Sequence, residues 1–400
     1  MKPSYPGFGL FKRHPRPHCK SIIMITDYWI ESIILAFTVS ILITGILIPQ
    51  IILIAFRKQL FDTPDERKIH QGIVPRLGGL AFFPAVAFSM AFVLGLNFRL
   101  DITELPLETW SDMIPFFFQL CALILIFLVG MADDLVGVRY RAKFMVQILS
   151  AILVVASGMY IDNLYGVLWL HELPAWLGWL VTGFVIVYIV NSINLIDGID
   201  GLASGLSAIA LTYYTIVLST SGYYAYAMTA AAAAGTLVPF FYYNVFGNPQ
   251  KRKKIFMGDT GSLTTGMILV FCGISVIYYD HPAIMADYNP VILAVSPLII
   301  PAFDVVRVYF HRVKRHRNPF LPDKSHIHHK LLALGLSQGS ALTIILSWSI
   351  VFIVSNVLLS PYANPNLLLG CDIAAWVVIN VLLTRAIRRR EARLGTTLYD

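Results

Sequence analysis

Eleven long apolar segments alternate with short polar loops along this chain of 400 residues. They lie near residues 31–56, 80–97, 115–131, 144–161, 175–193, 202–219, 225–242, 262–279, 290–306, 341–359 and 367–384. A helix needs about 20 mostly apolar residues to cross a hydrocarbon core of about 30 Å, where the backbone must satisfy its own hydrogen bonds. Only 13% of the residues are charged, about half the share in soluble domains. The sequence therefore predicts an all-α polytopic membrane protein with about 11 transmembrane helices.

Lysine and arginine residues are concentrated on one side of the predicted membrane. One set of alternate loops, together with the C-terminal tail, holds nearly all of them, whereas the loops of the other set hold only Arg99. Basic residues are retained on the cytoplasmic side of a membrane. We therefore expect the polar motifs of these loops to face the cytoplasm.

The predicted organisation is one transmembrane domain, residues 30–385, between an N-terminal tail, residues 1–29, and a basic cytoplasmic tail, residues 386–400. Eleven crossings would leave the basic residues between Lys2 and Lys20 outside, against the rule that orients the rest. We therefore expect translation to start at Met24, just ahead of the first span. The cysteines are scattered singly, which indicates neither a disulfide framework nor a zinc ribbon.

Two adjacent carboxylates, Asp133 and Asp134, stand at the cytoplasmic end of the third span. Such a pair is costly to desolvate and repels itself, so it usually shares a cation or a proton. The alternative is a charged helix end that faces water.

A second polar motif joins the fifth and sixth spans. Asn194, Asp197 and Asp200 are spaced at three residues, so a helical turn would align their oxygen atoms, and Gly198 and Gly201 allow close approach of a ligand. Oxygen donors of this kind suit Mg²⁺, which combines one or two protein ligands with water and substrate phosphates. A simple turn would account for a glycine but not for the three polar groups.

The third motif, Met257 to Ser262, follows the basic run Lys251 to Lys254. Its Asp259 belongs to the same layer as the other acids, although it could be only an N-cap for the eighth span. The basic run is interpreted as a topology determinant rather than a substrate clamp.

Two further loops carry donors. The loop Pro322 to Lys330 contains His326, His328 and His329, and Arg307 stands ahead of it. Zinc would need more ligands than these histidines supply, so they are interpreted as donors to phosphate or a nucleotide. The loop Asp62 to Gly79 leads into the second span and carries Lys68, His70 and Arg76; by itself it could be a cytoplasmic anchor.

Together these five loops resemble the polyprenyl-phosphate N-acetylhexosamine-1-phosphate transferase family. The match covers nearly all of residues 30–385 and includes the order of the motifs. The form His326-Ile327-His328-His329 is similar to the undecaprenyl-phosphate GlcNAc-1-phosphate branch rather than to the muramoyl-pentapeptide branch. One departure is Gly137, which stands where the family often has a third aspartate, so no third carboxylate acts there.

The resemblance implies transfer of GlcNAc-1-phosphate from UDP-GlcNAc to undecaprenyl phosphate, with release of UMP, at the cytoplasmic face of a bacterial inner membrane. It implies Mg²⁺, with Mn²⁺ as a substitute, on Asn194 and Asp259. Asp133 and Asp134 would orient or deprotonate the lipid phosphate. The implied substrate contacts are Lys68, His70, Lys143, Asp197, Asp200, Arg307, His326, His328 and His329.

Several alternatives stay open. The same reaction could use another UDP-N-acetylhexosamine or UDP-MurNAc-pentapeptide, and a secondary transporter is a distant competitor, because transporters also place acids in the membrane. No nucleic-acid partner is expected. The sequence leaves open a homodimer and the surface polysaccharide that the lipid product would feed.

Overall fold

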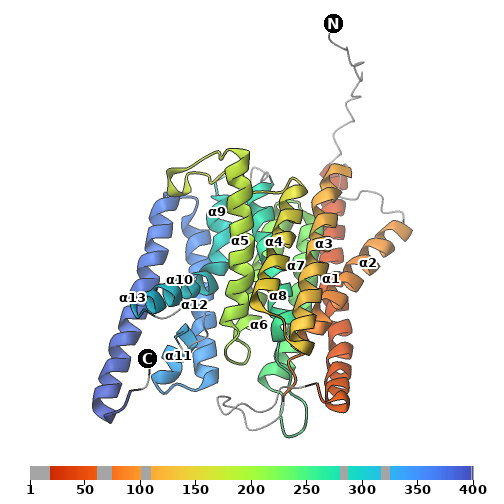
Figure 1. Cartoon of the computed structure of the whole chain (residues 1–400). Helices are drawn as coiled ribbons and strands as arrows, with labels where there is room; N and C mark the ends of the chain where they lie inside the picture. The colour runs from red at the N-terminus through yellow and green to blue at the C-terminus, as the bar shows by residue number, and fades with distance from the viewer. Residues whose placement is uncertain are drawn as a thin grey trace.

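The computed structural model describes residues 19–60, 74–100, 110–279, 287–316, 325–397 and 399, and its regular elements in these ranges are all helices (Figure 1). The long helices are α1 (Cys19–Lys58), α2 (Phe82–Arg99), α3 (Trp110–Val136), α4 (Tyr140–Ala156), α5 (Ala175–Ile196), α6 (Leu202–Thr220), α7 (Tyr224–Val245), α8 (Gly258–Tyr278), α10 (Ile299–Lys314), α12 (Gln338–Leu359) and α13 (Pro365–Leu394). The shorter ones are η1 (Gly78–Ala81), η2 (Val167–Trp169), α9 (Pro290–Val295), η4 (Ser296–Leu298) and α11 (Ile327–Ala333). The all-α prediction is confirmed.

Ten helical stretches within the described residues are long and apolar enough to cross a membrane. The remaining predicted span, 144–161, corresponds to α4, which has 17 residues and lies beside α3 and α5 in the bundle. One stretch, Pro290–Lys314, joins α9, η4 and α10. Ten of the eleven predicted spans are therefore present, with some of their ends displaced, and the shorter helix α4 stands in the place of the other.

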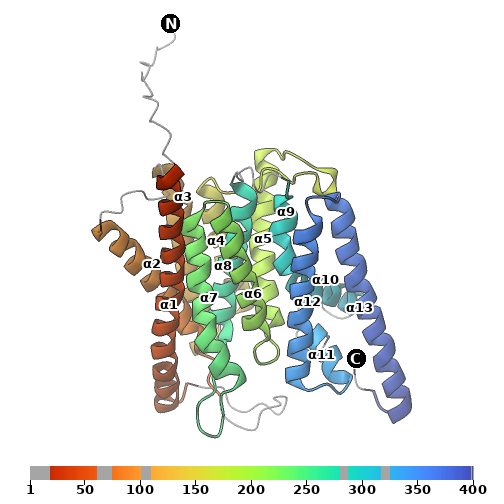
Figure 2. The ribbon, with the colours of Figure 1, turned by 180° about the vertical axis from the view of Figure 1, so that it is seen from behind.

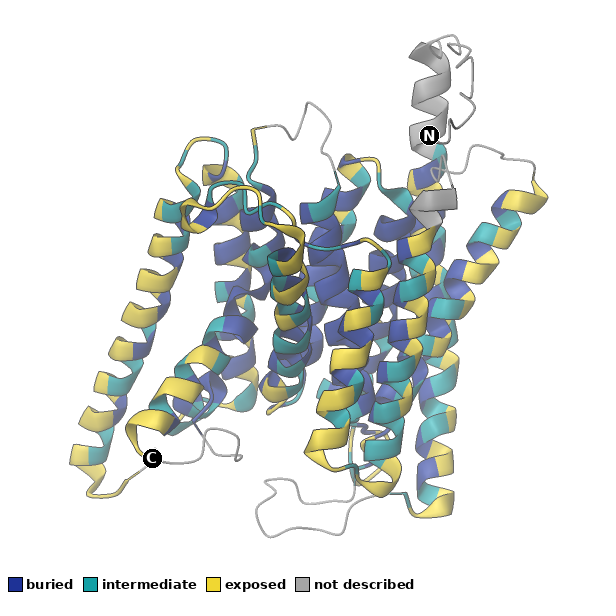
Figure 3. Cartoon of the chain, turned by 45° about the horizontal axis from the view of Figure 1, so that its top comes forward, coloured by how far each residue is buried: buried dark blue, intermediate teal, exposed yellow. Residues whose placement is uncertain are grey.

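Helix α8 forms the centre of the bundle, and every residue of its apolar window is buried. Its small residues let neighbouring backbones approach: a side chain at Gly266 would lie 2.9 Å from the Cα atom of Val190 in α5. The Ala-rich stretch Ala230 to Ala234 of α7 is also buried, and Ser40 of α1 donates to the carbonyl of Ala232 at 2.6 Å. Figure 3 shows the buried residues gathered inside the bundle and the exposed ones on its outer faces.

The chain turns between α9 and α10, where Pro297 and Pro301 follow each other closely. Proline cannot donate a backbone hydrogen bond and clashes with the preceding turn, so a bend here has a local cause. Helix α10 then lies oblique to its neighbours and continues to Lys314 (Figures 1 and 2), beyond the predicted end of the span at residue 306. Asp304 and Arg307 of α10 thereby lie beside the start of α11.

The motifs gather at one end of the bundle because of where the helices begin and end. Helices α3, α5 and α7 end there, α4, α6 and α8 begin there, and α11 packs between α12 and α13 at the same end (Figures 1 and 2). The opposite end holds the loop that contains η2, where Asn366 at the start of α13 donates to the carbonyl of Gly166. The fold therefore concentrates the polar loops on a single face.

Candidate active site

The ends of four helices, α3, α4, α5 and α8, bring together an acidic cluster. It consists of Asp133, Lys143, Asn194 and Asp259. Lys143 of α4 places its Nζ atom 2.7 Å from Oδ2 of Asp259 in α8 and 3.1 Å from Oδ2 of Asp133 in α3. Asn194, at the end of α5, donates its amide to Oδ1 of Asp259 at 3.2 Å and to the hydroxyl of Ser262 at 2.8 Å. Residues predicted from three separate motifs therefore contact one another directly.

Lys143 is the internal counter-ion of this cluster. Two carboxylates that face each other in a region of low dielectric repel strongly, and a single ammonium group between them offsets that repulsion. The side chains of Lys143, Asp133 and Asp259 keep 23%, 18% and 27% of their surface exposed. Solvent therefore reaches all three side chains of the cluster.

Asp134 has a different environment from its neighbour Asp133. Its Oδ1 atom accepts the backbone N–H of Asp259 at 2.8 Å, and its Oδ2 atom accepts the N–H and the hydroxyl of Thr260 at 2.9 and 2.5 Å. Asp134 thus caps the first turn of α8 from another helix. The alternative in which Asp259 is only an N-cap is wrong, because its carboxylate faces Lys143 and Asn194 instead.

Glycine at position 130 permits this cap. A Cβ atom there would lie 2.6 Å from the Cα atom of Thr260, closer than packed atoms can approach. Because Gly130 precedes Asp134 by about one helical turn, the close contact of α3 with α8 sets the carboxylate beside the free N–H groups. Asp133 therefore belongs to the acidic cluster, whereas Asp134 positions Asp259.

The loop that follows α5 is fixed from two sides. Asp200 pairs with Lys254, whose Nζ atom lies 2.5 Å from Oδ2 and which is 7% exposed. Asn244 of α7 accepts the N–H of Gly201 at 2.6 Å and donates to the carbonyl of Ile255 at 2.9 Å. The last lysine of the basic run therefore anchors this loop, whereas residues 251–253 are exposed.

Asp197 is the carboxylate of this loop that solvent reaches. Desolvation of the carboxylate, together with the charge of Asp259, raises the pKa of Asp197 to about 7, although the positive charge of Arg76 lowers it in part. Asp197 can therefore change its protonation state near neutral pH.

The loop that leads into α2 reaches the same site through residues 74–79. Phe256 donates to the carbonyl of Pro75, and Gly78 and Gly79 donate to the carbonyls of Phe256 and Met257. The backbone before η1 is thus paired with the backbone that leads into α8. Lys68 and His70, which are predicted substrate contacts, lie outside the described residues.

Asp304 of α10 contacts the histidine motif, which is residues 325–330 of the described chain. It is fully buried, and its Oδ1 atom accepts from Nη2 and Nε of Arg307 at 2.7 and 3.1 Å. Its Oδ2 atom lies 2.9 Å from Nδ1 of His326. No role was predicted for Asp304, although its position three residues before Arg307 indicates a pair on one helix face.

His328 lies between the histidine motif and the loop after α5. Its side chain is 1% exposed, and neither ring nitrogen has a hydrogen-bond partner in the described part of the chain. A Cβ atom at position 198 would lie 2.2 Å from Nε2 of His328, so glycine is required for this contact. Burial, together with the nearby His329, lowers the pKa of His328 to about 3, so the ring stays neutral.

The donor set fits a hard divalent cation better than zinc. Asp259, Asn194 and Asp133 offer oxygen atoms. The described residues contain no group of three or more His, Cys, Asp or Glu side chains that could hold a metal ion. Mg²⁺ accepts such an arrangement, because water and substrate phosphates supply most of its ligands. A zinc site built from protein ligands alone would need more of them.

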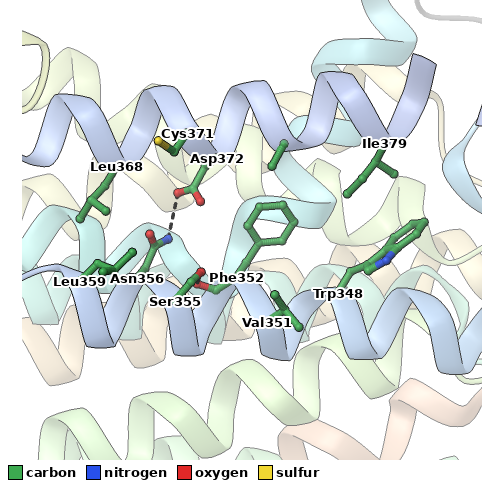
Figure 4. A pocket seen from close by; sticks show the side chains of 11 residues that line it. Trp348, Val351, Phe352, Ser355, Asn356, Leu359, Leu368, Cys371, Asp372 and Ile379 are labelled. Atoms are coloured by element: carbon green, nitrogen blue, oxygen red, sulfur yellow. Dashed lines mark hydrogen bonds between the residues drawn. The ribbon is translucent and has the colours of Figure 1, made fainter. Parts of the chain in front are cut away.

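A separate groove lies between α12 and α13 (Figure 4). Most of its lining is apolar, and it holds a buried pair in which Asn356 donates to Oδ2 of Asp372 at 2.9 Å. Asp372 belongs to the early turns of α13, near the opposite end of the bundle from α11. Asp372 is therefore an acid of the membrane region that lies apart from the acidic cluster.

Acids, an amide and cations gathered at one end of a helical membrane protein would suit a phosphorylated ligand, and comparison with known proteins defines the class. Residues 116–277 match the family model described as Glycosyl transferase family 4. This range contains the acidic cluster and the loop after α5, but not the histidine motif.

Curated relatives extend the match over most of the chain. A probable undecaprenyl-phosphate N-acetylglucosaminyl 1-phosphate transferase of Bacillus subtilis is 32% identical over 82% of this chain and 85% of its own length. An undecaprenyl-phosphate alpha-N-acetylglucosaminyl 1-phosphate transferase of Yersinia pestis is 30% identical over 87% and 93%. A decaprenyl-phosphate N-acetylglucosaminephosphotransferase of Mycolicibacterium smegmatis is 29% identical over 80% of each chain. The chain belongs to the polyprenyl-phosphate N-acetylhexosamine-1-phosphate transferase family.

Proposed function

We propose that this protein transfers GlcNAc-1-phosphate from UDP-GlcNAc to undecaprenyl phosphate and releases UMP. The product would be the first lipid-linked intermediate of a cell-surface polysaccharide. The observation that carries the proposal is the contact of Asp133, Lys143, Asn194 and Asp259 at one end of the bundle. The names of the curated relatives support the choice of lipid and sugar.

In this reaction an oxygen of the lipid phosphate attacks the phosphorus that carries the sugar. A new P–O–P bond to the lipid forms, and the bond to the bridging oxygen breaks, so that this oxygen and its electron pair leave with UMP. A phosphate monoester with a second pKa near 6 is mostly dianionic at pH 7, so it can attack without a strong base. The main tasks are the alignment of two anions and the compensation of their charge.

The acidic cluster suits the phosphate chemistry. Lys143 would contact an incoming phosphate, at the cost of its bonds to Asp133 and Asp259. Asp259 and Asn194 would hold Mg²⁺, which would stabilise negative charge on the diphosphate oxygens and on the departing UMP. Asp134 would act through Asp259, because its oxygens are engaged by the first turn of α8.

The second half of the site suits the nucleotide sugar. The loop that contains Asp197 and Asp200 lies between the acidic cluster and His328. Arg307 and the histidine motif would supply donors to the diphosphate or the sugar, with Asp304 holding Arg307 and His326 in place. The lipid phosphate and the nucleotide sugar would thus bind on opposite sides of the loop that contains Asp197 and Asp200.

The basic residues support an orientation with the site toward the cytoplasm. Within the described residues the site end carries Arg57, Lys58, Arg139, Arg141 and residues 251–254, whereas Arg99 lies at the opposite end. We therefore propose a multi-pass protein of the bacterial cytoplasmic membrane whose UDP-sugar comes from the cytoplasm.

The test is a reaction of the purified protein in lipid nanodiscs with undecaprenyl phosphate, Mg²⁺ and a panel of UDP-sugars. UMP release and the mass of the lipid product are measured. GlcNAc-diphosphate lipid is expected, and another UDP-sugar that reacts alone would change the substrate but keep the reaction class.

A matched pair of variants separates the site from the membrane region. Asp259→Asn and Asp372→Asn both convert a carboxylate to an amide, but only the first lies in the acidic cluster. Loss of UMP release in Asp259→Asn with activity kept in Asp372→Asn is expected. Solute counterflow in proteoliposomes without UMP release in the wild type would favour a transporter instead.

A further inference from the structure

We propose that Tyr399 is a positioning residue for the donor half of the site, a role that rests on the proposed function. The Tyr399 hydroxyl donates to the carbonyl of Ser325 at 2.6 Å. Arg307 donates from Nη2 to the same carbonyl. Because Ser325 directly precedes His326, a residue far along the chain fixes the start of the histidine motif.

The Tyr399 ring is itself held in place. Its backbone N–H donates to Oε1 of Glu391, in the last turn of α13, at 3.0 Å. The ammonium group of Lys330, in α11, lies 5.8 Å from the centre of the Tyr399 ring. Tyr399 therefore connects the end of α13 to both ends of the histidine motif, Ser325 and Lys330.

Helix α11 depends on tertiary contacts for its position, and its residues Ile327, His328, Lys330 and Leu331 are buried. It spans only Ile327–Ala333 and is too short to be stable by itself. It is docked on α13 through Lys330, which donates to Asn380 at 3.0 Å and to Thr384 at 3.1 Å, and through Arg390, which donates to the carbonyl of Ala333 at 3.0 Å. These contacts fix the body of the helix, and Tyr399 fixes the residue that precedes His326.

The consequence concerns Arg307 and His326. Asp304 and the Ser325 carbonyl together hold the Arg307 guanidinium, and Asp304 orients the His326 ring. If the Ser325 carbonyl shifts, Arg307 loses one of its acceptors and the backbone before His326 loses its link to the end of α13, although Asp304 still contacts both side chains. Tyr399 thus acts on donor binding through Ser325 and does not touch the acidic cluster in the described structure.

The experiment compares Tyr399→Phe with the wild type. Phenylalanine keeps the ring beside Lys330 and removes only the hydroxyl, with its bond to the Ser325 carbonyl and its contact with Arg307. We expect KM for UDP-GlcNAc to rise about fivefold, since one hydrogen bond is worth about 1 kcal/mol and 1.36 kcal/mol is tenfold. KM for undecaprenyl phosphate should stay within twofold. Tyr362→Phe is the matched control, because Tyr362 is 88% exposed beyond the far end of α12.

A second readout does not depend on the reaction. Amide hydrogen exchange in residues 325–330 should become faster in Tyr399→Phe, while exchange in α8 stays unchanged. Unchanged exchange, or faster exchange with an unchanged KM for UDP-GlcNAc, would overturn the positioning role. If the wild type releases no UMP, the proposed function fails, and the exchange measurement alone decides whether Tyr399 holds the motif.

Discussion

Replacement of Asp134 by asparagine tests whether this carboxylate positions Asp259 or acts on the substrate. In the wild type, Asp134 accepts hydrogen bonds from two backbone N–H groups and the Thr260 hydroxyl. Asparagine has one acceptor oxygen, so its NH₂ group must face at least one of these donors. Hydrogen bonds to a charged group contribute about 1.5 to 3 kcal/mol, and a lost helix cap typically costs about 1 kcal/mol.

These values give an expected loss of about 3 kcal/mol for Asp134→Asn, shared between the stability of the fold and the placement of Asp259. If the whole loss acted on the transition state, kcat would fall about 150-fold, because 1.36 kcal/mol corresponds to a factor of ten. Thr260→Val removes one of the same hydrogen bonds at nearly constant volume. It should lower kcat in the same direction, by about tenfold.

The assay is UMP release at saturating substrates between pH 6 and 9, together with thermal unfolding in detergent. Both variants should unfold at lower temperature, and the shape of the pH profile of kcat should be kept. The positioning role is refuted if Asp134→Asn is inactive with a wild-type unfolding temperature while Thr260→Val keeps the wild-type rate. That result would place Asp134 on the substrate itself.

Three further predictions address other parts of the site. Asp259→Asn should lower kcat more than 100-fold, with a weaker apparent affinity for Mg²⁺ in a metal titration; a wild-type rate at ordinary Mg²⁺ would contradict the ligand assignment. Gly198→Ala should lower the unfolding temperature and raise KM for UDP-GlcNAc, because the new methyl group would lie 2.2 Å from Nε2 of His328. Overpacking of this kind costs about 1 to 3 kcal/mol. An unchanged KM would show that the contact is dispensable. Burial lowers the pKa of His328 to about 3, so below about pH 6.5 the unfolded chain binds a proton on this ring and the folded chain does not, and the free energy of unfolding falls by about 1.4 kcal/mol per pH unit. The unfolding temperature of His328→Gln should therefore drop less than that of the wild type between pH 7.5 and 5.0. An equal drop in both proteins would argue against a neutral buried ring.

The sequence predicted the spans and the gathering of the motifs at one face for a simple physical reason. A helix that crosses lipid must be apolar over about 20 residues, so its ends are marked by the polar residues that flank it. Once the spans are counted, the parity of the crossings assigns Asp133, Asn194 and Asp259 to the same face. No knowledge of helix packing is needed for that step.

The partner of each polar side chain could not be predicted in the same way. Helix α8 is apolar on all sides and buried throughout its span, so no periodic pattern shows which face meets α3. The rotation of α3 against α8 decides that Asp133 faces Lys143 while Asp134 caps α8. The pairs Asp200 with Lys254 and Asp304 with His326 likewise join residues whose separation along the chain carries no signal.

The sequence by itself therefore determined a helical membrane protein and the end of the bundle at which its polar motifs meet. Only the tertiary structure decided which carboxylate is available to a ligand, which lysine is an anchor, and that Tyr399 reaches the histidine motif. The reason is that transfer into lipid depends on the local composition of a segment, whereas a hydrogen bond depends on the positions of two atoms that distant helices bring within about 3 Å.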